Sequence, residues 1–245
     1  MTSEPLLGKA ALVTGGARRI GREIALQLAA AGAEVTITYR TSRTEAEETI
    51  AVIKDLGRLA IAVECDVRSE ESVRDAVVAA VNFHGHLDLL VNNAAVYQSV
   101  LLDELTLEQW DTVFTTNARG PFLVARQAIG HLRKSQGRIV NIGSLGGLHA
   151  WAGHAHYCSS KAALHMLTQA MAKAFAPDVA VNCVAPGWID TGEAESESAA
   201  QHFASKTPMK RNGTAQDVAQ AVVFFASTTT FITGQILAVD GGLGL

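Results

Sequence analysis

Short apolar runs alternate along this chain with longer stretches in which apolar residues recur every three or four positions. The first pattern predicts buried strands, and the second predicts amphipathic helices. Seven strands are predicted, at Ala10–Val13, Val35–Tyr39, Leu59–Val63, Leu87–Val91, Arg138–Ile142, Val179–Val184 and Ile236–Val239. Helices are predicted between them, at about 20–28, 43–56, 69–83, 106–116, 121–132, 157–171 and 214–226. Thr106 and Gln109 have the spacing of a capping box, and Thr214 is an expected N-cap.

Strands that alternate with helices imply right-handed crossovers and a parallel sheet that is covered on both faces. The predicted fold class is therefore α/β, a single-domain Rossmann-type doubly wound parallel sheet of about seven strands. No linker, repeat or low-complexity tract divides residues 1–245. The one compositional break begins at Gly192, where glutamate, serine and alanine dominate. It predicts either a substrate lid at 192–210 or a solvated loop without a role.

Composition narrows the functional class. Hydrophobic residues make up 48% of the chain and charged residues 18%, which suits a protein with a large buried sheet. A formal net charge of −4 predicts no nucleic-acid partner, and no apolar segment reaches the ~18 residues of a membrane span. The first residues lack the pattern of a secretory signal, and the three cysteines lack metal-type spacing. We therefore expect reduced thiols and a cytoplasmic location.

The strongest chemical signal is Tyr157 followed four positions later by Lys161, with Ser144 upstream. Residues at i and i+4 share one face of a helix, so the two side chains lie one turn apart. A phenol titrates near pH ~10, and an adjacent ammonium favours the phenolate, so we expect Lys161 to lower the pKa of Tyr157. Ser144 would then be a second hydroxyl able to hydrogen-bond a substrate oxygen. The alternative interpretation is an aromatic ring packed under an extended lysine. The catalytic interpretation is favoured only if the rest of the chain provides a site for a hydride-carrying cofactor.

A cofactor site is predicted where the first strand meets the first helix. Glycines in the turn Thr14–Gly21 let the backbone approach a pyrophosphate, whose charge suits a helix N-terminus. The second strand ends without the acidic residue that binds the ribose 2′-hydroxyl of NADH, and arginine and hydroxyl residues stand there instead. Because this set would bind a 2′-phosphate, the predicted cofactor is NADPH. The residues concerned are Gly15, Arg18, Arg19, Ile20 and Gly21 in the turn, and Tyr39, Arg40, Thr41 and Ser42 after the second strand.

With these motifs in order, the chain resembles the short-chain dehydrogenase/reductase family from about Lys9 to Gly242. The resemblance implies that Ser144, Tyr157 and Lys161 are catalytic, and that Asn117 anchors a water in a proton relay to the lysine. It also implies a further set of cofactor-binding residues. These are Asp66 and Val67 at the adenine, Asn93, Ala94 and Ala95 at the adenosine half, Pro186, Gly187, Ile189 and Thr191 at the nicotinamide, and Tyr157 and Lys161 themselves.

Two positions depart from the family pattern. Arg19 replaces the middle glycine of the turn, and Ala95 replaces the glycine of the Asn-Asn-Ala-Gly motif. The first change, together with Tyr39-Arg40-Thr41, resembles the pteridine reductases and dihydromonapterin reductases. Tyr97 falls where pteridine reductases place an aromatic residue that stacks on the pterin. Reductases of the trypanosomatid type carry aspartate at the position of Ser144, which argues against a pterin substrate.

The resulting hypothesis is NADPH-dependent reduction of a small-molecule carbonyl, with Tyr157 as the proton donor. The alternatives are a pteridine reductase, an NADPH-binding sensor without catalysis, and a 3-oxoacyl carrier-protein reductase, which needs a basic patch for its acidic carrier. Candidates for that patch are Arg119, Arg126 and Lys210. Residues expected to line or flank the substrate cleft are Tyr97, His149, Trp151 and Trp188. The spacing of His149, His154 and His156, which also flank the cleft, is not that of a structural zinc site, so no metal is predicted.

The family resemblance also implies assembly. Members commonly form homotetramers through the helix after the fourth strand, the Tyr157 helix and the C-terminal strand, and a homodimer is the alternative here. Phe122, Leu123, Leu164 and Met166 are apolar residues of these helices and are compatible with such an interface.

Overall fold

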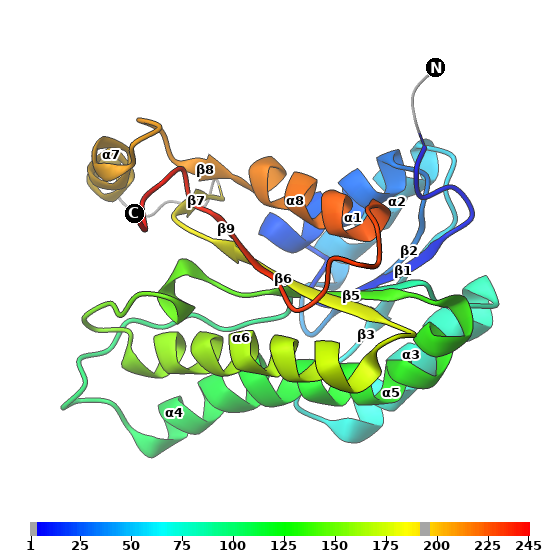
Figure 1. The fold of residues 1–245 in the computed structure, drawn as a ribbon, viewed down its shortest axis with the longest axis horizontal. Coiled ribbons are helices and arrows are strands. Elements are labelled where there is room, and N and C mark those ends of the chain that lie inside the picture. The colour runs from blue at the N-terminus through cyan, green and yellow to red at the C-terminus, as the bar shows by residue number, and fades with distance from the viewer. Residues whose placement is uncertain (1–3, 192–196) are drawn as a thin grey trace.

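Seven parallel strands form the central sheet of the computed structural model, which describes residues 4–191 and 197–245. Their order across the sheet is β3-β2-β1-β4-β5-β6-β9, and every neighbouring pair is parallel (Figure 1). The strands are β1 Ala10–Val13, β2 Glu34–Tyr39, β3 Ala60–Glu64, β4 Leu89–Asn92, β5 Arg138–Ile142, β6 Ala180–Pro186 and β9 Ile236–Val239. The predicted fold class is confirmed, and each strand lies where an apolar run predicts one.

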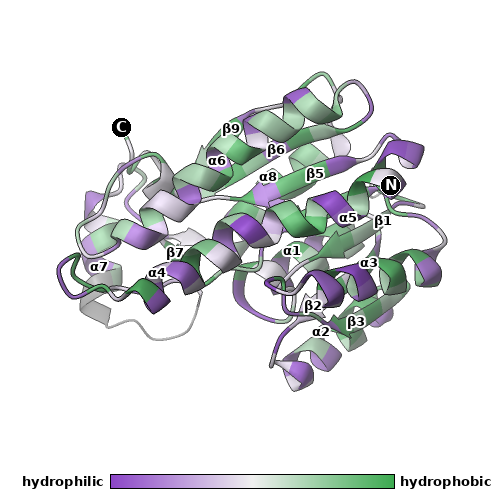
Figure 2. Ribbon diagram, turned by 90° about the horizontal axis from the view of Figure 1, so that it is seen from below, coloured by the Kyte–Doolittle hydropathy of each residue, from purple (hydrophilic) through white to green (hydrophobic). Residues whose placement is uncertain are grey.

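Helices cover both faces of the sheet. Their bounds are α1 Arg19–Ala30, α2 Arg43–Asp55, α3 Glu70–His84, α4 Leu107–Phe114, α5 Gly120–Ser135, α6 Ala155–Phe175, α7 Glu197–Lys206 and α8 Ala215–Ser227. Figure 1 shows α1, α2 and α8 above the sheet and α3, α5 and α6 below it. Ile24 and Val222 belong to the apolar cluster of the first face, and Val77 and Leu132 belong to that of the second. Figure 2 shows hydrophobic residues along the strands and many hydrophilic residues along α2 and α3.

Two helices begin at the capping boxes or N-caps that the sequence predicts. At the start of α4, Thr106 Oγ1 accepts the amide of Gln109 at 3.2 Å, and the amide of Thr106 donates to Gln109 Oε1 at 3.0 Å. Thr214 and Asp217 form the same reciprocal pair at the start of α8. Each box satisfies amides that have no partner within the helix, which fixes where the helix starts.

Several short elements carry no signal in the apolar pattern. β7 Ile189–Asp190 pairs in parallel with β8 Gly213–Thr214, apart from the central sheet. A π-helix, Thr115–Arg119 (η1), joins α4 to α5, and a 3-10 turn, Leu145–Gly147 (η2), follows Ser144. Elements of two to five residues are too short for a hydrophobic period to reveal them.

The candidate lid at 192–210 lies partly outside the described residues, since 192–196 are not among them. The described part contains α7, a helix that its glutamate- and serine-rich composition did not predict. Phe203 of α7 stacks on Trp188, with ring centroids 3.9 Å apart and planes 12° from parallel. Asn212 Nδ2 also donates to the carbonyl of Ala200 at 3.0 Å. The lid itself stays a prediction.

Two of the four expected interface residues belong to the core instead. Leu123 and Leu164 are buried within the subunit, at 7% and 1% exposure, whereas Phe122 and Met166 are exposed at 42% and 65%. The first two therefore contribute to packing of α5 and α6 against the sheet. All three cysteines are free and buried, as expected. Among the described residues, no helix is both long enough and apolar enough to cross a bilayer.

Candidate active site

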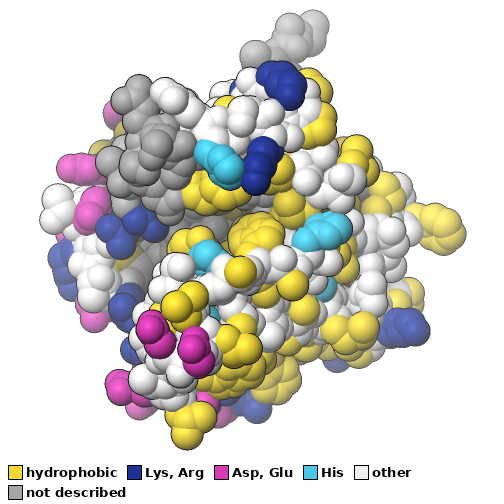
Figure 3. Space-filling model, turned by 90° about the vertical axis from the view of Figure 1, so that its left-hand side faces the viewer, with side chains coloured by type: hydrophobic (Ala, Val, Ile, Leu, Met, Phe, Trp, Pro, Cys, Tyr) yellow, Lys and Arg dark blue, Asp and Glu magenta, His cyan; other side chains and the backbone are white. Residues whose placement is uncertain are grey.

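A cleft of about 1170 Å³ opens at the carboxyl ends of the central strands. β1 and β4 are neighbours in the sheet but not in the chain, and this reversal of strand order leaves a crevice between the loops that follow them. Segments that follow each strand from β1 to β6 line the cleft. Figure 3 looks onto this end of the molecule and shows hydrophobic and histidine side chains gathered around a hollow. Ligands of open parallel sheets bind at such a point.

Glycines shape the turn between β1 and α1. Gly15 has a φ of 65°, and a Cβ added to it would lie 3.0 Å from the backbone of Ala94. A Cβ added to Gly21 would overlap the carbonyl oxygen of Gly15. The amide of Gly15 donates to Thr38 Oγ1 at 3.2 Å, which anchors the turn to β2. The turn therefore leaves room for a phosphate close to the N-terminus of α1.

Thr14 and Asn93 join this turn to the end of β4. The amides of Asn93 and Ala94 donate to Thr14 Oγ1 at 3.0 and 3.1 Å. Asn93 Nδ2 donates to the carbonyls of Thr14 and Gly15, both at 3.0 Å. These four bonds hold two adjacent walls of the cleft at a fixed separation.

Positive charge gathers at the nucleotide end of the cleft, which we define as the part lined by the segments after β1, β2 and β3. Arg18, Arg19 and Arg40 line this end and are exposed. Arg19 has a φ of 52°, in the left-handed region, which explains why the family pattern has glycine at its position. Among the described residues that line the cleft, the carboxylates are Asp66 and Asp190.

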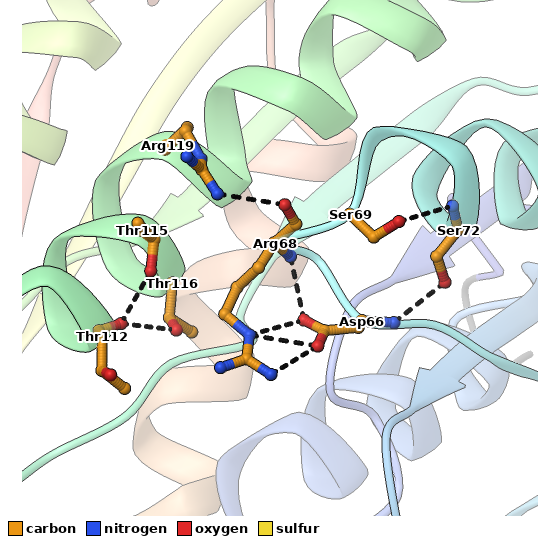
Figure 4. A network of polar contacts seen from close by, with 8 residues as sticks. All are labelled: Asp66, Arg68, Ser69, Ser72, Thr112, Thr115, Thr116 and Arg119. Carbon is orange, nitrogen blue, oxygen red and sulfur yellow. Dashed lines mark hydrogen bonds and ion pairs between the residues drawn. The ribbon is translucent and has the colours of Figure 1, made fainter. Parts of the chain in front are cut away.

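Asp66 lies just after β3, and its charge is balanced by Arg68. Arg68 Nε donates to the two carboxylate oxygens at 2.9 and 3.0 Å, and Nη2 donates to Oδ2 at 2.6 Å (Figure 4). These hydrogen bonds hold the pKa of Asp66 below its ordinary value, against the opposing effect of burial. Arg119 Nη2 donates to the carbonyl of Arg68 at 3.1 Å and ties this loop to η1. With Asp66 already paired with Arg68, Arg18 and Arg40 leave the nucleotide end with net positive charge.

Ser144, Tyr157 and Lys161 converge at the substrate end of the cleft, which we define as the part lined by the segments after β4, β5 and β6 and by the start of α6. Ser144 and Lys161 are buried, and Tyr157 is partly exposed. Lys161 Nζ donates to the carbonyl of Ile142 at 2.8 Å and lies 5.8 Å from the centre of the Tyr157 ring. Ser144 Oγ accepts the amide of Gly146 at 3.0 Å and hydrogen-bonds the Tyr157 hydroxyl.

The pKa of Tyr157 corrects one expectation. Burial raises it to about 12, and the hydrogen bond from Ser144 offsets only part of that rise. Burial also lowers the pKa of Lys161 to about 8. The expected net lowering of the phenol pKa is therefore wrong for this structure, because the loss of water around both groups favours their neutral forms.

Asn117 lies behind the cleft, within the π-helix η1. It is buried, its Oδ1 accepts the amide of Val96 at 2.9 Å, and its Nδ2 donates to the Val96 carbonyl at 2.9 Å and to Ser160 Oγ at 3.1 Å. The side chain thus fixes the loop after β4 to α6, next to Lys161. Both of its donors are used, so a relay water bound at Asn117 would have to donate to one of its oxygens.

Aromatic rings form much of the substrate end. Tyr97, Trp151 and Trp188 line it, as the sequence predicts. His149 lies outside the described lining; it is exposed, and a Cβ added to Gly244 would lie 3.1 Å from its Nε2. The prediction that His149 binds substrate therefore stays a prediction.

The cleft brings together most of the residues that the sequence singles out, although Asn117, His149, His154 and His156 are not among its described lining. Every predicted cofactor residue lines it, from Gly15 after β1 to Thr191 after β7. Lining residues that the sequence analysis missed are Ala17, Thr38, Cys65, Val96, Gln98, Thr116, Ile142, Gly143 and Asp190. Most of them adjoin a predicted residue at a strand end, which is a usable signal. Ala200 of α7 also lines the cleft and falls within the predicted lid at 192–210. Within 4–191 and 197–245, no group of three histidine, cysteine or acidic side chains is placed to hold a metal ion.

Known proteins resemble this chain over nearly all of its length. A family model described as enoyl-(acyl carrier protein) reductase matches residues 15–244. A 3-oxoacyl-(acyl-carrier-protein) reductase of Staphylococcus aureus is 37% identical over 240 residues, which cover 96% of this chain and 98% of the relative. A short-chain dehydrogenase of Burkholderia cenocepacia, solved in complex with NADP, is 40% identical with a TM-score of 0.94, and the match covers 98% of this chain and 100% of that one. A blue fluorescent protein from a metagenomic library, solved in complex with NADPH, is 35% identical with a TM-score of 0.93 and the same coverage.

Proposed function

This chain belongs to the short-chain dehydrogenase/reductase family of oxidoreductases, and we propose that it is an NADPH-dependent reductase of a small-molecule carbonyl compound. The observation that carries the proposal is the meeting of two sites in one cleft. Ser144, Tyr157 and Lys161 lie at the substrate end, and the arginine-bordered glycine turn lies at the nucleotide end. Carbonyl reduction needs a proton donor beside a bound hydride carrier, and this cleft has room for both.

Tyr157 is the proton donor in this proposal. Its pKa, raised by burial to about 12, keeps the phenol protonated at neutral pH, which is the form that a donor needs. Ser144 hydrogen-bonds the substrate oxygen and directs it towards the phenol. Lys161, with a pKa of about 8, is mostly protonated at neutral pH and stabilises the phenolate left after transfer. Asn117 holds the loop after β4 against α6 and anchors the water through which Tyr157 regains its proton.

The nucleotide end fits NADPH better than NADH. Arg18, Arg19 and Arg40 border it, and the carboxylate of Asp66 is already paired with Arg68. One charge-assisted hydrogen bond contributes roughly 1.5–3 kcal/mol, or about ten- to a hundredfold in affinity, so a single bond to the 2′-phosphate is enough for a preference. When bound, the nicotinamide supplies the hydride that reduces the carbonyl carbon. The segment from Pro186 to Thr191 holds its carboxamide.

A second candidate function is 3-oxoacyl carrier-protein reduction, which the name of the Staphylococcus aureus relative favours. That reaction needs a cationic surface for an acidic carrier, and one of the three candidate cations is already neutralised by a carboxylate. Arg126 pairs with Glu70, and Arg119 and Lys210 each donate to a backbone carbonyl. We therefore place this candidate behind reduction of a free carbonyl compound.

We also propose a cytoplasmic homotetramer or homodimer. Phe122 and Met166 are exposed on α5 and α6, where a second subunit would cover them. Three free cysteines suit a reducing compartment. Size-exclusion chromatography with light scattering would measure the assembly, and a monomer would contradict it.

A screen of NADPH oxidation tests the proposed function, with aryl ketones, diketones, quinones, acetoacetyl thioesters and dihydrobiopterin as substrates. We expect at least one ketone to be reduced, and NADH to support the reaction far less well. Much faster turnover of an acetoacetyl carrier protein than of the free thioester would select the second candidate, and activity confined to dihydrobiopterin would select a pteridine reductase. Tight NADPH binding without turnover of any substrate would contradict a reductase and indicate a sensor.

A further inference from the structure

Aromatic residues are concentrated in this cleft. Five of the six tyrosines and tryptophans of the chain line it, although phenylalanine, tyrosine and tryptophan together make up only 6% of the sequence. Tyr97, Trp151, Tyr157 and Trp188 lie at the substrate end and come from separate segments of the chain. The charged residues among the described lining of that end are Lys161 and Asp190. Such walls suit an uncharged substrate with a planar group.

His154 holds Tyr97 in place. The hydroxyl of Tyr97 lies 2.7 Å from His154 Nε2, and the two rings are 22° from parallel with centroids 5.1 Å apart. His154 Nδ1 lies 2.9 Å from the carbonyl oxygen of Ala152. A carbonyl can only accept, so Nδ1 carries the proton of the neutral ring and Nε2 is left to accept from Tyr97. The backbone of the loop before α6 therefore determines the direction of this hydrogen bond.

The same Tyr97 ring contacts the proposed proton donor. Its centroid is 4.9 Å from that of Tyr157, and the two planes cross at 89°. This edge-to-face arrangement is a favourable one for two aromatic rings. His154 is the N-cap residue of α6, and Tyr157 lies in its first turn. The start of one helix therefore positions both the donor and the residue that holds the ring beside it.

We propose that His154 is a positioning residue for substrate selection, because it holds Tyr97 as an aromatic wall beside Tyr157, and that this wall selects compounds in which a planar ring adjoins the carbonyl. The inference rests on the proposed reductase activity. A ring conjugated to the carbonyl would stack on the wall while its oxygen meets Ser144 and Tyr157. An alkyl chain of equal size would gain less from the same wall. Without an acceptor at position 154, the hydrogen bond between the two side chains is lost and the Tyr97 ring is held less firmly.

Steady-state kinetics of NADPH oxidation with acetophenone and with an octanone, which has the same number of carbon atoms, would test the inference. We expect His154→Leu to raise KM for acetophenone roughly three- to tenfold, the effect of losing one neutral hydrogen bond, with kcat changed less than about twofold. KM for the octanone should stay the same. His154→Gln keeps an acceptor and should recover most of the loss. His131→Leu removes a histidine of α5 that lies outside the described lining, and as the control it should change neither KM.

A double-variant cycle separates positioning from a general structural effect. Tyr97→Phe and His154→Leu break the same hydrogen bond, so the double variant should be no worse than His154→Leu alone. Additive losses, or equal losses for the two ketones, would overturn the positioning role and leave the reductase proposal intact.

A wild-type enzyme that reduces other substrates but does not favour acetophenone over the octanone would overturn the ring selectivity. No turnover of any substrate would instead overturn the proposed function. If His154→Leu fails to fold by circular dichroism, Tyr97→Leu removes the wall directly, and an unchanged preference for acetophenone in that variant would overturn the inference.

Discussion

The two ends of the cleft are built in different ways. At the nucleotide end the backbone does most of the positioning, since Gly15 and Gly21 allow it to approach closely. At the substrate end the side chains do it, since Tyr97 rests on His154 and Trp188 rests on Phe203 of α7. The first construction depends on conformations that few residue types adopt. The second depends on contacts between residues that lie far apart in the chain.

Charged residues also have different roles at the two ends of the cleft. Arg18, Arg19 and Arg40 are exposed, so their charges act on the affinity for a ligand. Tyr157 and Lys161 are held where burial favours the neutral form of each, so the surroundings act on protonation. Substitutions at the first end should therefore change which cofactor binds, and those at the second should change whether the reaction occurs.

Among these substitutions, Tyr157→Phe should have the largest effect on activity. If it did not, the proposed difference between the two ends of the cleft would be wrong. Removal of the proton donor should lower kcat by about a thousandfold, while Kd for NADPH changes less than about twofold. Tyr39→Phe makes the same change at the nucleotide end and should leave kcat unaltered. NADPH oxidation and fluorescence titration measure the two quantities. Near-normal turnover of Tyr157→Phe would assign the proton to another group.

Lys161→Met should stabilise the protein while it removes activity. Burial lowers the pKa of Lys161 from 10.5 to about 8, so carrying the charge in the folded state costs about 3 kcal/mol at neutral pH. Between pH 8 and 10.5 the unfolded chain binds more protons at this residue than the folded one. The penalty is therefore complete below pH 8 and disappears as the pH rises to 10.5. Urea unfolding should show Lys161→Met more stable than the wild type by up to about 3 kcal/mol at neutral pH, and the two should converge in alkali.

The test compares the unfolding free energies of Lys161→Met and the wild type, because other groups also titrate between neutral and alkaline pH. Burial raises the pKa of Cys183 to about 12, which makes both proteins less stable as the pH rises. Lys173→Met is the matched control, since Lys173 is exposed on the same helix and its replacement should change the stability only slightly. A gap between Lys161→Met and the wild type that stays constant from neutral pH to alkali would contradict the lowered pKa.

Arg40→Ala tests the nucleotide end by itself. It should raise KM for NADPH about ten- to a hundredfold and leave KM for NADH unchanged, because only NADPH carries the 2′-phosphate. Arg43→Ala is the control, since Arg43 pairs with Glu64 at 3.3 Å and is not among the described residues that line the cleft. Equal changes for NADPH and NADH in Arg40→Ala would show that Arg40 supports the turn rather than the phosphate.

Arg19→Gly should have the smallest effect on stability, and it separates backbone strain from cofactor binding at the nucleotide end. A φ of 52° costs a residue with a side chain about 1 kcal/mol, which glycine would recover. The same variant should bind NADPH less tightly. Gln136→Gly is the matched control, because Gln136 has a φ of 49° at the C-cap of α5, and it should gain similar stability without any change in NADPH binding. Thermal unfolding and NADPH titration measure both effects, and a less stable Arg19→Gly would show that contacts of the arginine outweigh the strain.

Much of this molecule could be predicted from the sequence because its signals are local. Apolar runs indicate every strand of the central sheet, and the strand ends then gather residues as distant as Gly15 and Thr191 in one cleft. The spacing of Tyr157 and Lys161 places both on one side of α6. The turn after β1 is recognisable because glycine is needed where a side chain would collide with neighbouring backbone.

The remaining features depend on tertiary contacts that no local pattern encodes. The pKa of Tyr157 follows from the loss of water around its hydroxyl, which outweighs the hydrogen bond from Ser144. Leu164 fills the core of the subunit, although its place on the Tyr157 helix suggested a subunit interface. α7 is helical although its sequence has little apolar content, and its stacking partner Trp188 lies outside the helix.

The small ladder of β7 and β8 has a consequence for engineering. It joins Ile189 to Gly213 and Asp190 to Thr214, so the excursion 191–212 departs from and returns to one base. Closing a loop costs only ~0.6 kcal/mol more for each doubling of its length. This excursion can therefore be shortened, extended or exchanged for that of a relative while the seven-stranded sheet keeps its register. Grafting at that base is the most economical route to an enzyme that accepts different molecules.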